Sequence, residues 1–215
     1  VPLLANIVNL VYILQTKIYR SGLFRVFYVY EPKKRLVQAP AFVDKVVQHA
    51  LVDNLIYERI TRSFILDNYA SQRGKGLHFG LDRLKGWNKY RTAEGWVLKA
   101  DVRHFFASID HDRLKEKLKK LDLEPVVYDL LCTYIDSTDG LPLGYQTSQL
   151  FALLFLDEFD HFVKERLASA GMAVIWMTFS SSTLTKNTCN FASKKSGLSW
   201  PVWGWSSMRK PRFSR

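Results

Sequence analysis

Two kinds of residue are scarce in this chain of 215 residues: cysteine throughout, and acidic residues after position 165. The 2 cysteines, Cys132 and Cys189, lie far apart and in no spacing typical of a metal site, which excludes a zinc or disulfide framework. This usage is typical of a reducing compartment, so we expect a cytoplasmic protein. The apolar opening Val1–Leu14 is short and follows no basic segment, so we expect neither a signal peptide nor a membrane span.

The missing acids separate the chain into two parts of different composition. Residues 1–165 carry 23 Lys and Arg against all 20 Asp and Glu, whereas residues 166–215 carry eight basic residues and no acid. The net charge of +11 therefore comes mostly from the tail and is weak support for any particular partner. Four of the six tryptophans also lie beyond residue 171, where no helix or strand period survives.

The chain as a whole has the composition of a folded protein, because 47% apolar and 24% charged residues exclude wholesale disorder. Leu23–Tyr30 is rich in aromatic and β-branched residues and predicts a strand, followed by a basic turn at Lys33, Lys34 and Arg35. Helical spacing of apolar residues predicts a helix over 42–60, and alternation over Trp96–Val102 predicts a second strand.

Three later features indicate two more helices and the loop between them. Asp110 is a typical N-cap for a helix over His111–Leu121. Gly140–Gly144 predicts a loop, and Ser148 is then expected to cap an amphipathic helix that runs to about Ser169.

Several of these features admit a chemical and a plain structural interpretation. Asp101, at the end of a strand, could hold Mg²⁺ for phosphoryl transfer, but on its own it is more economically a cap of the next turn. The basic turn at 33–35 could grip a triphosphate or be a solvated hairpin turn, and Arg73-Gly74-Lys75-Gly76 could follow a nucleic-acid backbone or end a helix. Asp157, Asp160 and His161 share one helix face, where the polar side of an amphipathic helix explains them more simply than a metal site.

Taken in order, the segments resemble the reverse transcriptases of bacterial retroelements over roughly residues 24–175. Residues 24–51 are similar to the family's fingers blocks, and Phe64–Leu84 to the block that touches the template and primer backbone. Val97–Asp110 (VLKADVRHFFASID) resembles the first palm motif, and Gly140–Gln149 (GLPLGYQTSQ) the block that cradles nucleotide and template. The form Leu-Gly-x-x-x-Ser-Gln resembles the diversity-generating retroelement and group II intron-like branch.

The resemblance implies roles for named residues. Asp101 becomes a catalytic ligand of two Mg²⁺ ions, and Phe106 the aromatic gate that excludes a ribose 2′-OH. The implied nucleotide contacts are Lys33, Lys34, Arg35, Phe106, Leu143 and Gly144. The implied template and primer contacts are Arg73, Lys75, Ser148 and Gln149.

The resemblance also implies the fold and the partners. The expected fold is α+β, with polymerase fingers over residues 1–95, a partial palm over 96–175 and a non-family tail over 176–215. The expected partners are an RNA template, a DNA or RNA primer, dNTPs and a retroelement accessory protein, with no membrane.

One departure from the family is severe. The aromatic-x-Asp-Asp hairpin that completes the metal site is replaced by Val174–Phe179 (VIWMTF), and the later palm and thumb are missing. Trp and Met have single codons and every Thr codon begins with AC. Read from the third base of the Ile175 codon, residues 176–178 therefore give xTG-GAT-GAC, which encodes Asp-Asp. The tail is thus interpreted as a shifted reading frame.

We accordingly expect an RNA-directed DNA polymerase by family that is inactive as this chain. Two alternatives stay open. The chain is a non-catalytic nucleic-acid-binding remnant, or it is a defective fragment without a function of its own.

Overall fold

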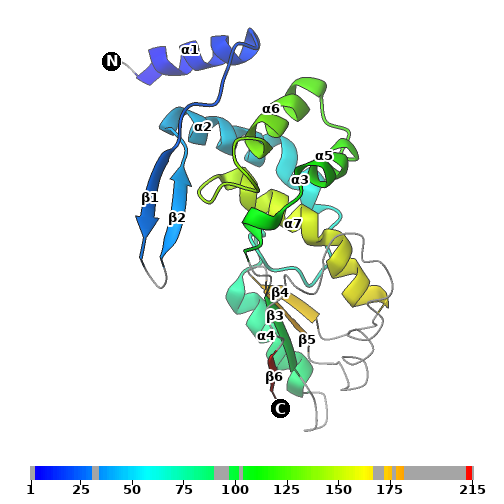
Figure 1. Cartoon of the computed structure of the whole chain (residues 1–215). Coiled ribbons are helices and arrows are strands. Elements are labelled where there is room, and N and C mark those ends of the chain that lie inside the picture. The colour runs from blue at the N-terminus through cyan, green and yellow to red at the C-terminus, as the bar shows by residue number, and fades with distance from the viewer. Residues whose placement is uncertain are drawn as a thin grey trace.

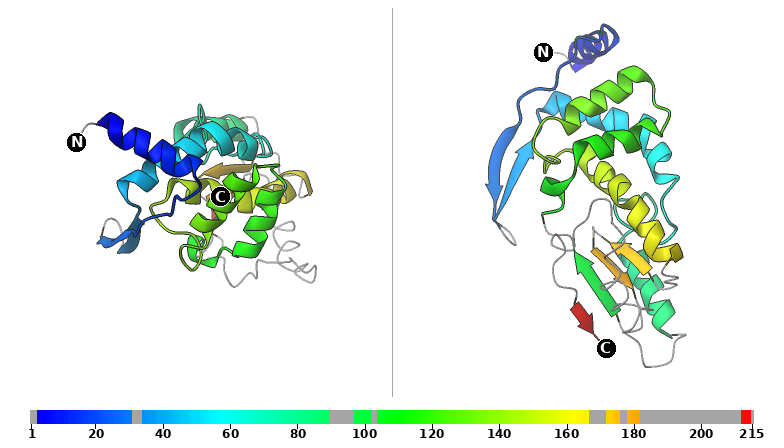
Figure 2. Two further views of the ribbon diagram at one scale, coloured as in Figure 1. Left: turned by 90° about the horizontal axis from the view of Figure 1, so that it is seen from above. Right: turned by 45° about the vertical axis from the view of Figure 1, so that its right-hand side comes forward.

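The computed structural model describes residues 3–30, 34–89, 97–101, 104–166, 172–175, 178–181 and 212–214. Figure 1 shows a helical body with helix α1 (Leu3–Gln15) at one end and a small sheet at the other. A two-stranded hairpin extends beside the body, and the further views in Figure 2 show the same elongated arrangement. Within the described residues, no helix combines the length and the apolar character needed to cross a membrane.

The body is built around one long, almost entirely buried helix, α7 (Gln146–His161), which continues as a π-helical turn over Phe162–Arg166. Every residue from Leu150 to Leu156 is buried, so the middle of this helix is covered on all sides. The helices around it are α2 (Phe42–Leu51), α3 (Tyr57–Thr61), α5 (His111–Lys119) and α6 (Pro125–Ile135). A π-helical turn over Val52–Ile56 joins α2 to α3, which confirms the helix predicted over 42–60.

The two N-caps expected from the sequence have different outcomes. Asp110 caps α5 as expected, since its Oδ1 accepts the Arg113 N–H at 3.0 Å. The expected Ser148 cap is wrong, because α7 already begins at Gln146 and Ser148 lies buried in its first turn. The Gln146 N–H instead donates to Oε1 of Gln48 in α2 at 3.0 Å. A partner from another helix has replaced the local cap.

Two antiparallel sheets complete the chain. Strand β1 (Arg25–Val29) pairs with β2 (Arg35–Ala39), which confirms the strand predicted over Leu23–Tyr30. The second sheet has the order β4-β5-β3-β6, and helix α4 (Leu77–Lys89) contacts its β4 strand. Its central strand β3 (Val97–Asp101) confirms the strand predicted over Trp96–Val102.

The sheet reaches further along the chain than the sequence predicts. Strand β4 (Met172–Ile175) forms a hairpin with β5 (Thr178–Ser181), and β6 (Arg212–Ser214) pairs with β3 on its other edge. The sequence shows no helix or strand period beyond residue 171, yet three short strands lie there. Short strands need only a partner with free backbone groups, and β3 offers both of its edges.

Polar side chains tie the end of α7 to the segment after α3. Asp67 is buried, and it accepts hydrogen bonds from Tyr69 Oη (2.7 Å), Arg83 Nε (3.3 Å) and Lys164 Nζ (2.5 Å). Burial alone would raise the pKa of Asp67, but these hydrogen bonds outweigh it and lower the pKa. Asp67 thereby joins α4 and the end of α7 through charge-assisted hydrogen bonds.

Asp160 is a buried carboxyl group in this region. Because it is only 2% exposed, the interpretation of Asp160 as part of a solvated polar face is wrong. Burial, with the nearby Asp157 carboxylate adding to it, raises the pKa of Asp160 to about 8. Asn68 Nδ2 donates to Asp160 Oδ2 at 3.2 Å, which leaves the other carboxyl oxygen to carry the proton.

We predict that Asp160→Asn stabilises the protein increasingly as the pH rises from about 5 to about 8. The unfolded carboxyl has a pKa of about 3.9, so unfolding of the wild type releases a proton across this window and its stability falls as the pH rises. Asparagine has no proton to release. Urea unfolding at pH 8 is expected to show a gain on the order of 1–3 kcal/mol. Asp82→Asn is the matched control, because the Asp82 side chain is 73% exposed. A stability gain of Asp160→Asn that is the same at every pH would contradict the prediction.

Candidate functional site

The loop over residues 140–144 joins two parts of the molecule that are distant in sequence. The Leu141 N–H donates to the Phe106 carbonyl oxygen at 2.7 Å, and the Gln38 N–H in β2 donates to the Leu143 carbonyl oxygen at 2.8 Å. The loop therefore fixes the β1–β2 hairpin on one side and the turn after β3 on the other.

Two glycines permit this close approach. Gly140 has φ +70° and Gly144 has φ +128°, a backbone region that residues with a Cβ rarely adopt. A Cβ on Gly144 would lie 2.6 Å from the Gln38 carbonyl oxygen, and one on Gly140 would lie 2.6 Å from Ala107 Cα. The Gly140–Gly144 loop predicted from the sequence is confirmed, and its glycines are required by contact with the neighbouring segments.

Phe106 lies in a short 3₁₀ turn over Phe106–Ser108, next to this loop. Its ring meets the buried Phe105 ring edge-on, with centroids 6.1 Å apart, and Phe106 itself is half-buried. Leu143 and Gly144 are exposed on the loop. Three of the expected nucleotide contacts, Phe106, Leu143 and Gly144, thus lie in the turn and the loop that the bond from Leu141 to Phe106 joins.

The basic turn lies at the far end of the hairpin strand that the loop holds. Arg35 begins β2 opposite Val29 and is three residues from Gln38, a span of roughly 10 Å along the strand. Lys34 precedes it, and Lys33 lies outside the described residues.

Asp101 is the last residue of β3, as expected, and its Cα pairs with that of Thr178 in β5. Ile175 and Thr178 pair in the β4–β5 hairpin, so only residues 176 and 177 separate these strands. Thr178, within the segment where the family's Asp pair is expected, is therefore next in the sheet to Asp101. Among the described residues, no three His, Cys, Asp or Glu side chains gather in a way that would hold a metal ion.

The expected template and primer residues lie along the loop after α3 and the start of α7. Gln149 Oε1 accepts a hydrogen bond from Ser71 Oγ at 3.3 Å, which brings α7 to this loop. Arg73 pairs with Asp53 at 2.5 Å, and its guanidinium carbon lies 4.3 Å from the centroid of the Tyr57 ring. Lys75 Nζ donates to the Leu66 carbonyl oxygen at 3.0 Å.

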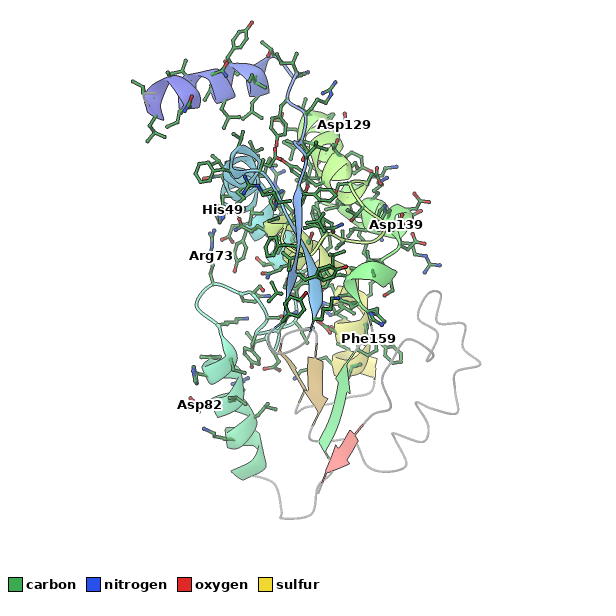
Figure 3. The ribbon with its side chains drawn as sticks, turned by 60° about the vertical axis from the view of Figure 1, so that its left-hand side comes forward. His49, Arg73, Asp82, Asp129, Asp139 and Phe159 are labelled. Atoms are coloured by element: carbon green, nitrogen blue, oxygen red, sulfur yellow. The ribbon has the colours of Figure 1, made fainter. Side chains whose placement is uncertain are left out.

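These residues differ in how they could meet a ligand. Ser148 is buried and faces the core, whereas Gln149 and Arg73 are exposed. His49 lies on the same side of the molecule as Arg73, and its Nδ1 is 3.8 Å from the same Asp53 carboxylate (Figure 3). Among these described residues, Arg73 and Gln149 are therefore accessible to a ligand. Arg73 already pairs with Asp53, but this ion pair is exposed and thus weak.

The sequence analysis did not identify the side chains that bind the Gly140–Gly144 loop and the helix ends beside it. Gln48 binds the start of α7, and His111 Nε2 lies 2.9 Å from the Gly140 carbonyl oxygen. Lys115 pairs with Asp136 at 2.7 Å, which fixes α5 to the end of α6 below the loop. No local pattern marks these side chains, because each acts on a segment far away in the sequence.

No protein-family profile and no curated protein matches the sequence. Solved structures do. The chain is similar to the telomerase of Candida tropicalis truncated from its C-terminal domain, with a TM-score of 0.56 and 11% identity over 89% of this chain and 50% of that one. It is similar to the telomerase of Candida albicans in complex with the TWJ fragment of telomeric RNA, with a TM-score of 0.60 and 10% identity over 93% of this chain and 44% of that one.

Telomerase is related to the reverse transcriptases, so this likeness shows that the chain has a reverse-transcriptase-like fold. The chain spans half or less of the length of these telomerases. At such low identity the likeness concerns the fold alone and assigns no branch of the family.

We predict that Gly144→Ala destabilises the protein by about 1–3 kcal/mol, because the new Cβ meets the Gln38 carbonyl and the backbone must stay at positive φ. Urea unfolding measures the loss, and faster amide exchange at Gln38 locates it. Gly76→Ala is the control, since nothing lies within 4 Å of its Cβ position. Equal effects of the two substitutions would argue against the close approach.

Proposed function

We propose that this chain is the fingers (residues 1–95) and part of the palm (residues 96–175) of an RNA-directed DNA polymerase of a bacterial retroelement. The observation that carries the proposal is the loop over 140–144, which joins the hairpin bearing Arg35 to the turn bearing Phe106. The proposed ligands are an RNA template, a DNA or RNA primer and dNTPs. The proposal includes a cytoplasmic location and a retroelement accessory protein as a partner.

The roles follow from the chemistry of the side chains. A guanidinium binds two phosphate oxygens at once, so Arg35 suits a triphosphate, with Lys33 and Lys34 adding charge. An aromatic ring such as that of Phe106 has no polar group for a ribose 2′-OH and fills the space that it needs. Arg73, Lys75, Ser148 and Gln149 are the proposed template and primer contacts, and the hydrogen bond from Ser71 to Gln149 supports this by joining the loop after α3 to the start of α7.

The residues present do not fit the two Mg²⁺ ions of the family reaction. Two divalent ions held close together need several carboxylate oxygens. Asp101 is the proposed ligand from β3, but residues 176–178 are Trp, Met and Thr, and the sequence has no acid after Glu165. We therefore propose that this chain binds template, primer and nucleotide but does not join the nucleotide to the primer. The missing carboxylates thus favour the alternative of a non-catalytic remnant.

The proposed frame shift accounts for the missing acids. The shifted Asp codons span the codons of residues 176–178. The pairing of Asp101 with Thr178 supports this reading, since an Asp pair there would adjoin Asp101 at the end of β3. Sequencing the gene tests it directly. TCN codons for Ser180–Ser182 become xTC in the shifted frame and encode Phe, Leu, Ile or Val, which gives an apolar strand after the Asp pair. AGY codons there would give no apolar residue and would contradict the frame shift.

We predict that the 215-residue chain binds a template–primer duplex but shows no Mg²⁺-dependent nucleotide incorporation. Fluorescence anisotropy should give an affinity that falls steeply with salt. Replacing the basic residues of the hairpin turn and the 73–75 loop with alanine should weaken binding at least tenfold and reduce the salt dependence; these residues are Lys33, Lys34, Arg35, Arg73 and Lys75.

The basic tail is the necessary control for this experiment. A matched variant replaces five tail residues with alanine: Lys194, Lys195, Arg209, Lys210 and Arg215. If only this second variant loses affinity, the binding site is not the proposed one. Unchanged affinity in the first variant also contradicts the proposed site, and a chain that does not bind the duplex at all is the inert fragment. Incorporation that Asp101→Ala abolishes would overturn the statement that the chain is inactive.

A fourth prediction concerns the metal. Met177→Asp combined with Thr178→Asp should create a Mn²⁺ site that the parent chain lacks, because two carboxylates are then added to that of Asp101, which pairs with position 178 in the sheet. Calorimetric titration with Mn²⁺ measures it, and adding Asp101→Ala should remove most of the gain. Binding that is indifferent to Asp101 would show that the hairpin does not bring these positions to β3.

A further inference from the structure

The two faces of the β1–β2 hairpin have different surroundings. Val37 faces the Gly140–Gly144 loop, since its Cγ1 would lie 3.4 Å from a Cβ on Gly144. Successive side chains in a strand alternate between faces, so Leu36 and its partner Tyr28 lie on the opposite, outer face. Val26 and Tyr30 share this face, and all four side chains are exposed.

The outer face presents a pair of aromatic rings under a cation. The rings of Tyr28 and Tyr30 have centroids 6.4 Å apart, and the two residues are 52% and 67% exposed. Lys34 Nζ lies 4.3 Å from the Tyr28 centroid and 6.0 Å from that of Tyr30. Each ring keeps much of its surface in solvent, while the ammonium stands beside both.

The charge of the hairpin selects among possible occupants. Residues 23–40 contain four basic residues and one acid, a net charge of +3, which equals the net charge of all of residues 1–165. An apolar protein surface laid on this face would cover the Lys34 ammonium without supplying an anion, which is costly. A strand of nucleic acid supplies both a flat base for the rings and a phosphate for the ammonium.

We propose that the outer face of the β1–β2 hairpin binds unpaired nucleotides of a single-stranded nucleic acid. Bases stack on Tyr28 and Tyr30, and Lys34 contacts the adjoining phosphate. The inference rests on the proposed function in one respect: if the chain binds a template and primer, the bound strand is the unpaired part of the template. The stacking surface itself needs neither primer nor nucleotide.

The test separates stacking from charge by using two probes on the full chain. One is a fluorescein-labelled oligouridylate of about 12 nucleotides, and the other is a chain of the same length and charge in which the sites are abasic. The wild type should bind the oligouridylate about tenfold more tightly than the abasic chain. Tyr28→Ala and Tyr30→Ala should each lose about fivefold or more for the oligouridylate and leave the abasic affinity unchanged.

Matched variants make the outcome specific. Tyr28→Phe and Tyr30→Phe keep the ring and should bind as the wild type does, and Tyr12→Ala removes an equally exposed tyrosine from α1 with no effect. Equal affinity for the two probes overturns the inference. So does a Tyr28-dependent dimer in sedimentation velocity without any oligonucleotide, which would make the face a contact between copies.

The two proposals fail in different experiments. Loss of duplex binding upon alanine substitution at the hairpin turn and the 73–75 loop tests the proposed function. Probe-dependent loss at Tyr28 and Tyr30 tests the stacking face. If the chain binds the duplex but does not discriminate against the abasic strand, the proposed function stands and the stacking face is refuted.

Discussion

The rest of the site depends on the close contact between the Gly140–Gly144 loop and the two segments beside it. The hairpin is a two-stranded element, which is only marginally stable alone, and a backbone hydrogen bond from Gln38 to Leu143 ties it to the body. The bond from Leu141 to Phe106 fixes the other side of the same loop. Because both bonds converge on one short loop, a change in its backbone moves the basic turn and Phe106 relative to each other.

Glycine is needed at the loop for a steric reason. The carbonyl of Gln38 occupies the space that a side chain at position 144 would fill, and the backbone of Ala107 does so at position 140. His111 and Gln48 then secure the loop and the start of α7 from below. The nucleotide-binding half of the proposed site is thus built on the rigid helical body, and the hairpin carries its basic residues outward from it.

The distribution of charge along the chain is the basis of the proposed binding without catalysis. Basic residues of the described chain lie at the start of β2 and along the loop after α3, where phosphates are proposed to lie. The end of β3 has Asp101, with Trp, Met and Thr in the adjoining hairpin. Several carboxylates would be required there to offset the repulsion between two divalent ions. Asp160 of α7 does not supply one of them, since it is buried in the core beside Asn68.

The sequence by itself determined the elements whose pattern is local. The strand at β1, the helix from Phe42 onward, the Asp110 cap and the strand that ends at Asp101 all follow from periodicity and end signals, because neighbours in the chain decide them. The ordered set of motifs indicated the reverse-transcriptase-like fold. The tertiary structure alone decided that α7 begins at Gln146 under Gln48, that Ser148 faces the core, and that tail strands pair with both edges of β3. Those outcomes depend on segments about 100 residues apart, whose contacts leave no period in the sequence.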